Sequence, residues 1–234
     1  MEVLWRDNNS GCKGVCARVP SEDVSDADDT ALCGDGECHD EILLRGLQER
    51  IDATQGDVLV VLHQQGSHGP EYYKRYPDRF ERFTPVCASN LPQDCDRREI
   101  VNAYDNTILY TDYVLDRLIE LLEKDARRAH NDTALLYLSD HGESLGENGL
   151  YLHGFPYALA PREQTHIPAL AWFSRGFGLD RRCVAGTADN AYSQDNLFDS
   201  VLGLFRVQTS VYVPGKDIFA ACRSPGAALQ AARH

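Results

Sequence analysis

Short apolar runs that end at polar loops alternate along this chain with longer segments in which apolar residues recur every three or four positions. Two runs, 58–62 (Val-Leu-Val-Val-Leu) and 134–138 (Ala-Leu-Leu-Tyr-Leu), have the length and composition of buried parallel strands. Residues 3–5 and 168–173 have the pattern of two further strands. The alternation predicts an α/β fold, with a mostly parallel sheet covered by helices on both faces.

Three segments between the strands predict helices. Asp40 is a candidate N-cap for the first helix, because a side-chain oxygen at this position can accept a backbone N–H of the first turn. We expect the apolar stripe of each helix to face the core. The stripes are Ile42, Leu43, Leu47 and Ile51; Val101, Tyr104, Ile108, Leu115, Leu118 and Leu122; and Leu197, Val201, Leu204 and Phe205.

The chain is long enough for one substantial core. It has 234 residues, of which 43% are hydrophobic, and no repeat or linker divides it, so we expect a single domain over residues 1–234. A membrane helix needs about 20 consecutive apolar residues, and neither such a run nor a signal peptide is recognisable. We therefore expect the chain itself to be soluble and to carry no export signal.

The net charge excludes one class of partner and disfavours another. At −13 with neutral histidines, the chain lacks the basic face that contact with nucleic-acid phosphates requires. The same charge disfavours free adsorption to an anionic lipid surface. An acidic domain that acts on a negatively charged lipid would need a tether to the membrane.

Candidate chemistry begins where the strand 134–138 ends, at Ser139-Asp140-His141-Gly142-Glu143-Ser144. Ligands of open α/β sheets bind at the carboxyl ends of the strands, so Asp140 and His141 would enter a cleft. A carboxylate oxygen and an imidazole nitrogen are both ligands that suit Zn²⁺. The pair therefore predicts a metal site.

Two further histidines could reach the same site. His68 lies in the loop after strand 58–62, and His153 follows Asp140 closely enough for the chain to fold back over the Asp-His loop. A lone histidine is more often a hydrogen-bonded loop or core residue than a ligand. Three histidines together favour a shared site.

These residues belong to long motifs that follow one another along the chain. The motifs are residues 5–16, 62–70, 102–107, 139–144 and 164–168. In their order they resemble the periplasmic catalytic domain of the phosphoethanolamine transferases that modify lipid A, in the sulfatase-like branch of the alkaline phosphatase superfamily. The motifs Cys-Lys-Gly-Val-Cys and Gly-Ser-His-Gly-Pro favour this branch over a sulfatase or a phosphoglycerol transferase. The resemblance implies an alkaline phosphatase/sulfatase-like fold that here lacks its N-terminal part.

The resemblance also implies a reaction. A zinc-activated threonine attacks phosphatidylethanolamine, and the phosphoethanolamine group then passes to a lipid A phosphate. The implied cofactor is Zn²⁺, with Asp140 and His141 as two of its ligands and Glu143 beside the metal. Reduced binding of cationic peptides, including polymyxin, is the consequence implied for an intact enzyme.

Further site residues follow from the same resemblance. His68 and His153 match residues near the phosphate, which can bind a second zinc or protonate a leaving oxygen. Asn9 and Lys13 match positions that hold the phosphoethanolamine group of the donor, and Lys13 would offset developing negative charge.

Two parts of the family's site are expected to lie outside this sequence. In the family, the threonine and a metal-binding glutamate precede the Trp-Arg-Asp-Asn motif, which begins here at residue 5. We therefore expect an N-terminally truncated chain that is inactive by itself, while the parent has a membrane domain and acts at the periplasmic face of the inner membrane. The alternative is a noncatalytic remnant that binds zinc weakly. With half of the ligands present, zinc should raise the melting temperature little.

Eight cysteines leave two interpretations open. Six form close couples, and the first four could make a structural zinc site. The third couple has no partner for a second such site, and the oxidising periplasm that the resemblance implies favours disulfides between near neighbours. Whether Cys183 and Cys222 pair stays open. The close couples are Cys12 and Cys16, Cys33 and Cys38, and Cys87 and Cys95.

Overall fold

The computed structural model describes residues 1–34 and 36–223. They divide into two compact units, one formed by residues 1–125 and 136–170 and the other by residues 126–135 and the chain from 171 onward. None of the helices in the described part combines the length and hydropathy that a membrane span needs. The helices and strands are β1 (Glu2–Asp7), β2 (Ser21–Asp23), β3 (Cys33–Gly34), β4 (Glu37–Cys38), α1 (Leu47–Ala53), β5 (Val58–His63), α2 (Arg97–Ala129), β6 (Ala134–Leu138), β7 (Ser144–Leu145), β8 (Tyr151–Leu152), α3 (Arg162–Thr165), β9 (Ala169–Phe173), α4 (Arg181–Thr187) and α5 (Asp195–Leu204).

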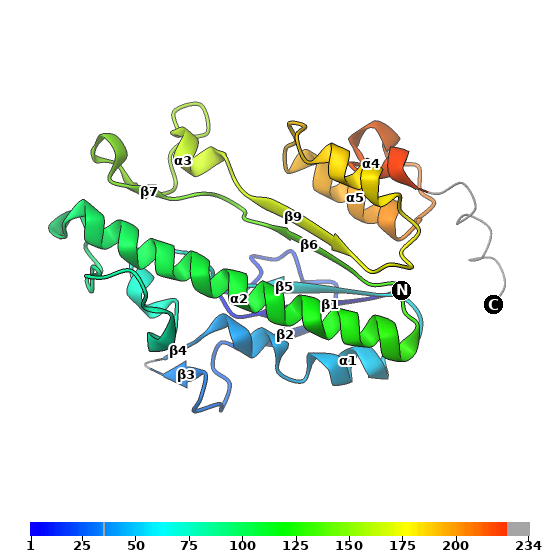
Figure 1. Cartoon of the computed structure of the whole chain (residues 1–234), viewed down its shortest axis with the longest axis horizontal. Coiled ribbons are helices and arrows are strands. Elements are labelled where there is room, and N and C mark those ends of the chain that lie inside the picture. Colours follow the sequence, from blue (N-terminus) through cyan, green and yellow to red (C-terminus); the bar gives the residue numbers. More distant parts are fainter. Residues whose placement is uncertain (35, 224–234) are drawn as a thin grey trace. The chain divides into compact units, whose positions relative to one another are not determined.

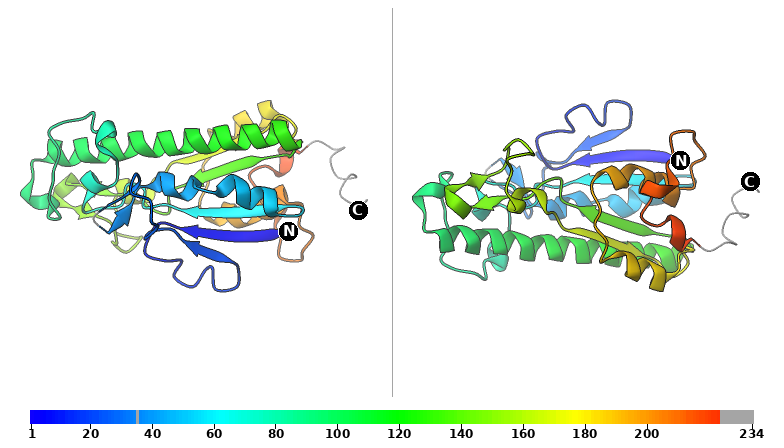
Figure 2. Two further views of the ribbon diagram at one scale, coloured as in Figure 1. Left: turned by 90° about the horizontal axis from the view of Figure 1, so that it is seen from below. Right: turned by 90° about the horizontal axis from the view of Figure 1, so that it is seen from above.

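A parallel sheet organises the first unit. Its strand order is β2-β1-β5, and both neighbours run parallel to β1, with Trp5 opposite Ser21 and Asp7 opposite His63. The carboxyl ends of these strands therefore lie at the same edge, as their arrows show in Figure 2. The predicted parallel sheet with helices is confirmed.

β6 and β9 form a separate two-stranded sheet. At one end Ser174 N donates to Thr133 O, and at the other Ser139 N donates to Pro168 O. Partners whose numbers rise on one strand as they fall on the other belong to an antiparallel pair. β9 therefore runs opposite to β6, a reversal that the alternation of strands and helices did not indicate.

The long helix α2 confirms the second predicted helix, but its buried face lies about one residue away from the predicted stripe. Ile100, Ala103, Tyr110 and Val114 are buried, whereas Ile108 of the predicted stripe is 47% exposed. The displacement arises because polar Asn106 and Thr107 occupy buried positions. Asn106 Oδ1 accepts the backbone N–H groups of Arg82 and Phe83, so its burial leaves no unsatisfied donor there.

The first predicted helix is two pieces. A 3₁₀ turn, η1 (Asp40–Leu44), precedes α1, and Gly46 separates them with a φ of 67°. The predicted capping role of Asp40 is wrong, because His39 occupies the N-cap position and η1 has no side-chain cap. The carboxylate of Asp40 is instead buried against other loops.

η1 and α1 pack along α2 (Figure 1). The backbone N–H of Glu41 donates to the hydroxyl of Tyr110, at 3.1 Å. Gln48 Nε2 donates to Asp125 Oδ1, at 3.0 Å. These bonds join η1 and α1 to α2.

All eight cysteines form disulfides. The three close couples pair as expected, Cys12 with Cys16, Cys33 with Cys38 and Cys87 with Cys95. Cys183 pairs with Cys222, which sequence left undecided. The alternative of a zinc site built from the first four cysteines is excluded, because their sulfurs are bonded to one another.

Candidate functional site

The site lies on loops that follow strand ends in the first unit. One loop follows β1, a second follows β5 and a third follows β6. The short hairpin β7–β8 then turns the chain back, with Ser144 opposite Leu152 and Leu145 opposite Tyr151. This register puts Glu143 opposite His153, so the predicted folding back over the Asp-His loop has a definite structural cause.

Three histidines from these loops form a cluster. His68, His141 and His153 each offer one nitrogen, and these nitrogens all lie within 4.8 Å of one another. The rings of His141 and His153 stack with centroids 3.8 Å apart, and the ring of His68 lies 4.8 Å from that of His153. The chain thus brings together residues that are more than 70 positions apart in the sequence.

Hydrogen bonds orient all three rings in the same way. Nδ1 of His68 lies 2.7 Å from Gly69 O, and Nδ1 of His141 lies 3.1 Å from Gly142 O. A carbonyl only accepts, so Nδ1 is the donor in each ring, and the neutral form of such a ring has its lone pair on Nε2. Nδ1 of His153 lies 3.1 Å from Glu143 Oε1, which favours the same tautomer. This is the usual arrangement of histidines that bind a metal, so the cluster fits a divalent cation.

The predicted metal pair lies at the margin of this cluster. Asp140 Oδ1 is 3.7 Å from His141 Nε2, close to the separation of about 3.3 Å between two ligands on one tetrahedral zinc. The Asp140 side chain is 82% exposed. His141 therefore belongs both to the predicted Asp-His pair and to the three-histidine cluster.

Glu143 is buried at the centre of the hydrogen bonds behind the histidines. Besides His153, it accepts the backbone N–H of Gly69 and the hydroxyl of Tyr72, both at 3.2 Å. Burial raises the pKa of Tyr72, and the negative charge of Glu143 raises this pKa further, so the hydroxyl remains a donor. Tyr72 is 2% exposed and anchors Glu143 through its hydroxyl, a role that no local pattern in the sequence indicates.

Two glycines let the loops approach closely. A Cβ at Gly142 would lie 2.0 Å from the backbone oxygen of Glu163, and a Cβ at Gly69 would lie 2.5 Å from Leu152 Cδ2. Gly142 N donates to Gln164 O, and Gln164 Nε2 donates to Ser144 Oγ and Leu152 O. Gln164 thereby braces the β7–β8 hairpin, a role that its place in a motif did not reveal.

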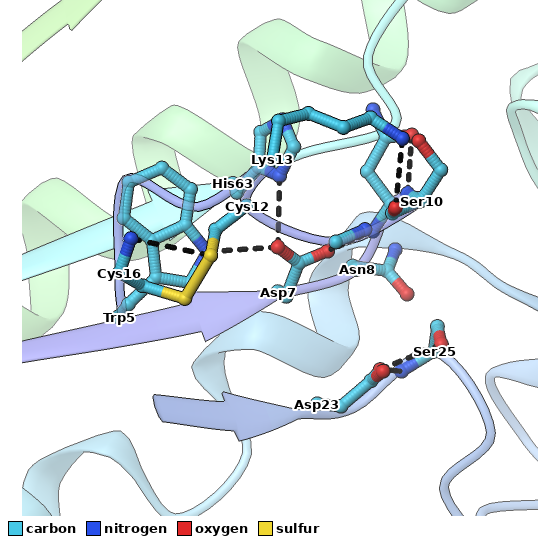
Figure 3. A network of polar contacts seen from close by, with 12 residues as sticks. Trp5, Asp7, Asn8, Ser10, Cys12, Lys13, Cys16, Asp23, Ser25 and His63 are labelled. Atoms are coloured by element: carbon cyan, nitrogen blue, oxygen red, sulfur yellow. Dashed lines mark hydrogen bonds and ion pairs between the residues drawn. A yellow bond between two sulfur atoms is a disulfide. The ribbon is translucent and has the colours of Figure 1, made fainter. Parts of the chain in front are cut away.

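The predicted donor-binding residues lie on the loop after β1. Asn9 Nδ2 donates to Gln64 O at 3.0 Å, which ties this loop to the one that carries His68. Lys13 lies between the bonded Cys12 and Cys16, has a φ of 50°, and donates from Nζ to Ser10 O (Figure 3). The ammonium group of Lys13 is exposed, while the backbone around it is held by the disulfide.

Asp7 shapes that loop. Its Oδ2 accepts Trp5 Nε1 at 2.7 Å and lies 3.0 Å from His63 Nδ1, and its Oδ1 accepts the backbone N–H groups of Asn9 and Gly11 (Figure 3). Burial raises the pKa of Asp7, but the bonds from His63, Trp5 and Asn9 outweigh burial and hold the pKa below its usual value. The Asp-His contact follows from the register that sets Asp7 opposite His63.

Comparison with known proteins identifies the family. The model of the sulfatase family matches residues 1–207. The chain belongs to the sulfatase family. Within that family its relatives are phosphoethanolamine transferases, which confirms the resemblance carried by the motifs.

Two relatives with known names match most of this chain but less than half of their own length. The phosphoethanolamine transferase EptA of Salmonella typhimurium is 50% identical over 233 residues, which are 95% of this chain and 41% of the relative. The phosphatidylethanolamine transferase Mcr-1 of Escherichia coli is 41% identical over 214 residues, which are 88% of this chain and 38% of the relative. The chain thus spans about two-fifths of the length of these relatives.

Solved structures show the same fold. The soluble domain of lipooligosaccharide phosphoethanolamine transferase A from Neisseria meningitidis is 46% identical, with a TM-score of 0.91 over 96% of this chain and 68% of that one. The C-terminal periplasmic domain of phosphoethanolamine transferase EptC from Campylobacter jejuni is 45% identical, with a TM-score of 0.78 over 93% of this chain and 66% of that one. The predicted alkaline phosphatase/sulfatase-like fold is therefore confirmed.

Proposed function

We propose that this chain carries the histidine-lined part of the catalytic domain of an enzyme that moves phosphoethanolamine from phosphatidylethanolamine to a lipid A phosphate. The relatives bear the name of that reaction class, one of them naming phosphatidylethanolamine. Another relative is the Kdo(2)-lipid A phosphoethanolamine 7''-transferase of Escherichia coli, 33% identical over 136 residues. The observation that carries the proposal is the cluster of three histidines, in each of which Nδ1 is already engaged in a hydrogen bond.

Zn²⁺ is the proposed metal. Imidazole nitrogens with a carboxylate nearby are a ligand set that zinc accepts, and His141 with Asp140, His68 and His153 supply it. When bound, such an ion supplies Lewis acidity that offsets charge on phosphoryl oxygens and lowers the pKa of a nucleophile. Because the nitrogens of His68, His141 and His153 lie within 4.8 Å of one another, zinc should stabilise the chain measurably, in contrast to the small effect expected from half of a ligand set.

Glu143 and His153 form the proposed proton-handling pair. The buried carboxylate accepts a hydrogen bond from Nδ1–H of His153, which makes Nε2 more basic. When no metal occupies Nε2 of His153, the same carboxylate would stabilise the imidazolium form of His153, which could then donate its Nε2 proton to a leaving oxygen. Gly69 N and Tyr72 keep Glu143 in place for either role.

Lys13 and Asn9 are the proposed donor-binding residues. An exposed ammonium group on a loop closed by a disulfide can meet a phosphate without reorganising its backbone. Asn9 lies on the same loop, and its amide reaches Gln64 of the His68 loop. A phosphoethanolamine group held here would be presented to the histidine loop.

The proposed location is the periplasmic side of the inner membrane. Four disulfides favour an oxidising compartment. Two of the solved relatives are described as an integral membrane protein and as a periplasmic domain. The acidic charge of this chain gives it no electrostatic attraction to anionic lipid, so we propose that a tether outside these 234 residues holds it at the membrane.

The test is transfer from a fluorescent phosphatidylethanolamine to lipid A. The chain is assayed by itself and in place of the matching 41% of the Salmonella typhimurium relative. We expect the chimaera to be active and its His141→Ala variant to be inactive. An inactive but folded chimaera, or a preference for phosphatidylglycerol, would contradict the proposal. Activity of the chain by itself would contradict the expectation that its nucleophile lies elsewhere.

A further inference from the structure

A second buried carboxylate lies behind the loops of the site. Asp40 is 4% exposed and comes from η1, directly after the β3–β4 hairpin. Its Oδ1 accepts Asn8 Nδ2 and the backbone N–H of Gln65, and its Oδ2 accepts the backbone N–H of Gly66, each at 2.8 Å. One side chain thus binds both the loop after β1 and the loop after β5.

The loop after β1 depends on this carboxylate through Asn8. Asn8 is fully buried, and its Nδ2 also donates to Cys38 O, at 2.9 Å. Its backbone N–H donates to His63 O, at 2.9 Å. Three hydrogen bonds thus hold Asn8 in place. The next residue is Asn9, whose side chain reaches Gln64.

The loop after β5 is held by hydrogen bonds at four successive residues, 65–68. Asp40 binds the N–H groups of Gln65 and Gly66. The hydroxyls of Ser67 and Thr107 lie 2.6 Å apart. Arg75 Nε donates to His68 O at 2.9 Å, while the same guanidinium pairs with Glu37. An acidic group thus binds N–H groups at one end of the loop, and a basic group binds a carbonyl at the other.

The chemistry of Asp40 suits this place. Three N–H donors meet its two oxygens, so both oxygens must accept, and only a carboxylate does this without presenting a donor of its own. An amide would set an NH₂ group against an N–H. Burial raises the pKa of Asp40, while the bonds from Asn8, Gly66 and Gln65 and the charge of Arg75 oppose that rise.

We propose that Asp40 is a positioning residue, which sets the loop of Asn9 and the loop of His68 in register with each other. The inference rests on the proposed function, since it is there that Asn9 and His68 act on one substrate. Asp40 touches neither of them, so its effect passes through Asn8 and through the backbone of Gln65 and Gly66.

The main test variant is Asp40→Asn in the 234-residue chain, with Asp199→Asn as the matched control. Asp199 is also a buried carboxylate that accepts a backbone N–H, from Val213, and it lies in the second unit. Both changes are isosteric, and both should lower the melting temperature. Only the change at Asp40 should alter the site.

Two measurements distinguish a positioning role from a structural one. Titration with Co²⁺, followed by its absorption bands, reports the affinity of the histidine cluster, and Asp40→Asn should weaken it at least about tenfold. Long-range ¹H–¹⁵N spectra report the tautomer of each histidine ring. His68 should change from a single Nδ1–H form to averaged tautomers in Asp40→Asn, and neither reading should change in Asp199→Asn.

The outcomes separate this inference from the proposed function. If Asp40→Asn folds and leaves both the Co²⁺ affinity and the His68 ring unchanged, the positioning role is wrong. If the unaltered chain binds no Co²⁺, the proposed metal chemistry fails, while the His68 spectrum still decides the role of Asp40. Asp40→Ser, which leaves room for a water in place of an opposing donor, is used if Asp40→Asn does not fold. Failure of both variants to fold would assign Asp40 to stability and overturn the proposal.

Discussion

Two histidine–carboxylate pairs in the first unit have almost the same geometry. His153 Nδ1 lies 3.1 Å from Glu143, and His63 Nδ1 lies 3.0 Å from Asp7. The histidine side chains are 31% and 30% exposed, and both carboxylates are buried. Judged by the pair alone, each could serve equally well as a metal-binding or proton-transferring unit.

The surroundings of the two pairs make the difference. The ring of His153 stacks on His141 and lies against His68, so its Nε2 shares a centre with other ligand atoms. The ring of His63 lies against Trp5, with centroids 5.4 Å apart. Its carboxylate partner uses its other oxygen to hold the backbone of the loop after β1. The first pair is thus suited to chemistry and the second to shaping a loop.

The largest expected effect that separates the pairs is on metal binding. Zn²⁺ should raise the melting temperature of the unaltered chain in a concentration-dependent way, because it binds the folded state. His141→Ala should weaken Zn²⁺ binding by more than about 100-fold, because it removes a ligand shared by the cluster and by Asp140. His63→Ala is the control and should keep the zinc-dependent shift. Equal losses in the two variants, measured by calorimetry, would show that the pairs do not differ as described.

A second comparison uses one glycine from each region. Gly142→Ala should lower the free energy of unfolding by about 3 kcal/mol, because its Cβ would lie 2.0 Å from a backbone oxygen. Gly11→Ala, in the loop that Asp7 holds, meets no atom within 4 Å but has a φ of +85°. It should cost only about 1 kcal/mol. Urea unfolding measures the free energy of unfolding of both variants. Similar losses would show that the loop after β6 can move to accommodate the added Cβ, contrary to its close contacts.

Acid should act on the Asp7 pair in a defined pH range. The folded pKa of Asp7 lies below its usual value, so its ionised form stabilises the fold above the unfolded pKa of about 3.9, and this contribution is lost as pH falls through the folded pKa. Asp7→Asn should therefore lower the free energy of unfolding by about 2 kcal/mol at neutral pH. The difference from the unaltered chain should shrink below about pH 4.

Asp116→Asn is the control for this pH series, since its side chain is 65% exposed. A surface change of this kind should stay within about 0.5 kcal/mol at every pH. A constant difference between Asp7→Asn and the unaltered chain across the acid range would contradict the linkage to ionisation.

The smallest effects concern single donors to the two carboxylates. Tyr72→Phe removes one hydrogen bond to Glu143, and Trp5→Phe removes one to Asp7. Each should lower the free energy of unfolding by about 1 kcal/mol. Only Tyr72→Phe should also weaken Zn²⁺ binding, by a few-fold, because it loosens the carboxylate that orients His153. Weaker zinc binding in Trp5→Phe would contradict this distinction, because it would show that the Asp7–His63 pair also contributes to the metal site.

Local patterns predicted much of the fold. The runs 58–62 and 134–138 became β5 and β6, and the three- and four-residue repeat after residue 97 became α2. The buried face of α2 was misplaced because Asn106 and Thr107 are polar, yet their hydrogen bonds are made inside the protein. Polarity alone does not tell whether a partner will be available in the folded state.

The candidate site was also predicted only in part, because local patterns do not show which distant groups will lie beside a residue in the folded state. Asp140 and His141 were proposed because they are neighbours at a strand end, and His68 and His153 because their loops could reach that end. Glu143 was proposed only from the family resemblance. Asp40 was misread as a helix cap, because the Asn8, Gln65 and Gly66 groups that surround it are distant in sequence. The part of Tyr72 was equally invisible, since Glu143 lies 71 positions away.

The amino-acid sequence by itself determined the types and order of the elements, the close cysteine couples and the residues able to bind a metal. These features depend on periodicity and on neighbours only a few residues apart, which every segment carries in its own composition. Only the tertiary structure decided which histidines lie close together. It also decided that Glu143 is hydrogen-bonded to one of these histidines, whereas Asp7 binds the backbone of the loop after β1. Those outcomes depend on the register of β1 with β5, on the β7–β8 hairpin and on which buried polar groups find partners, and each requires distant segments to be packed together.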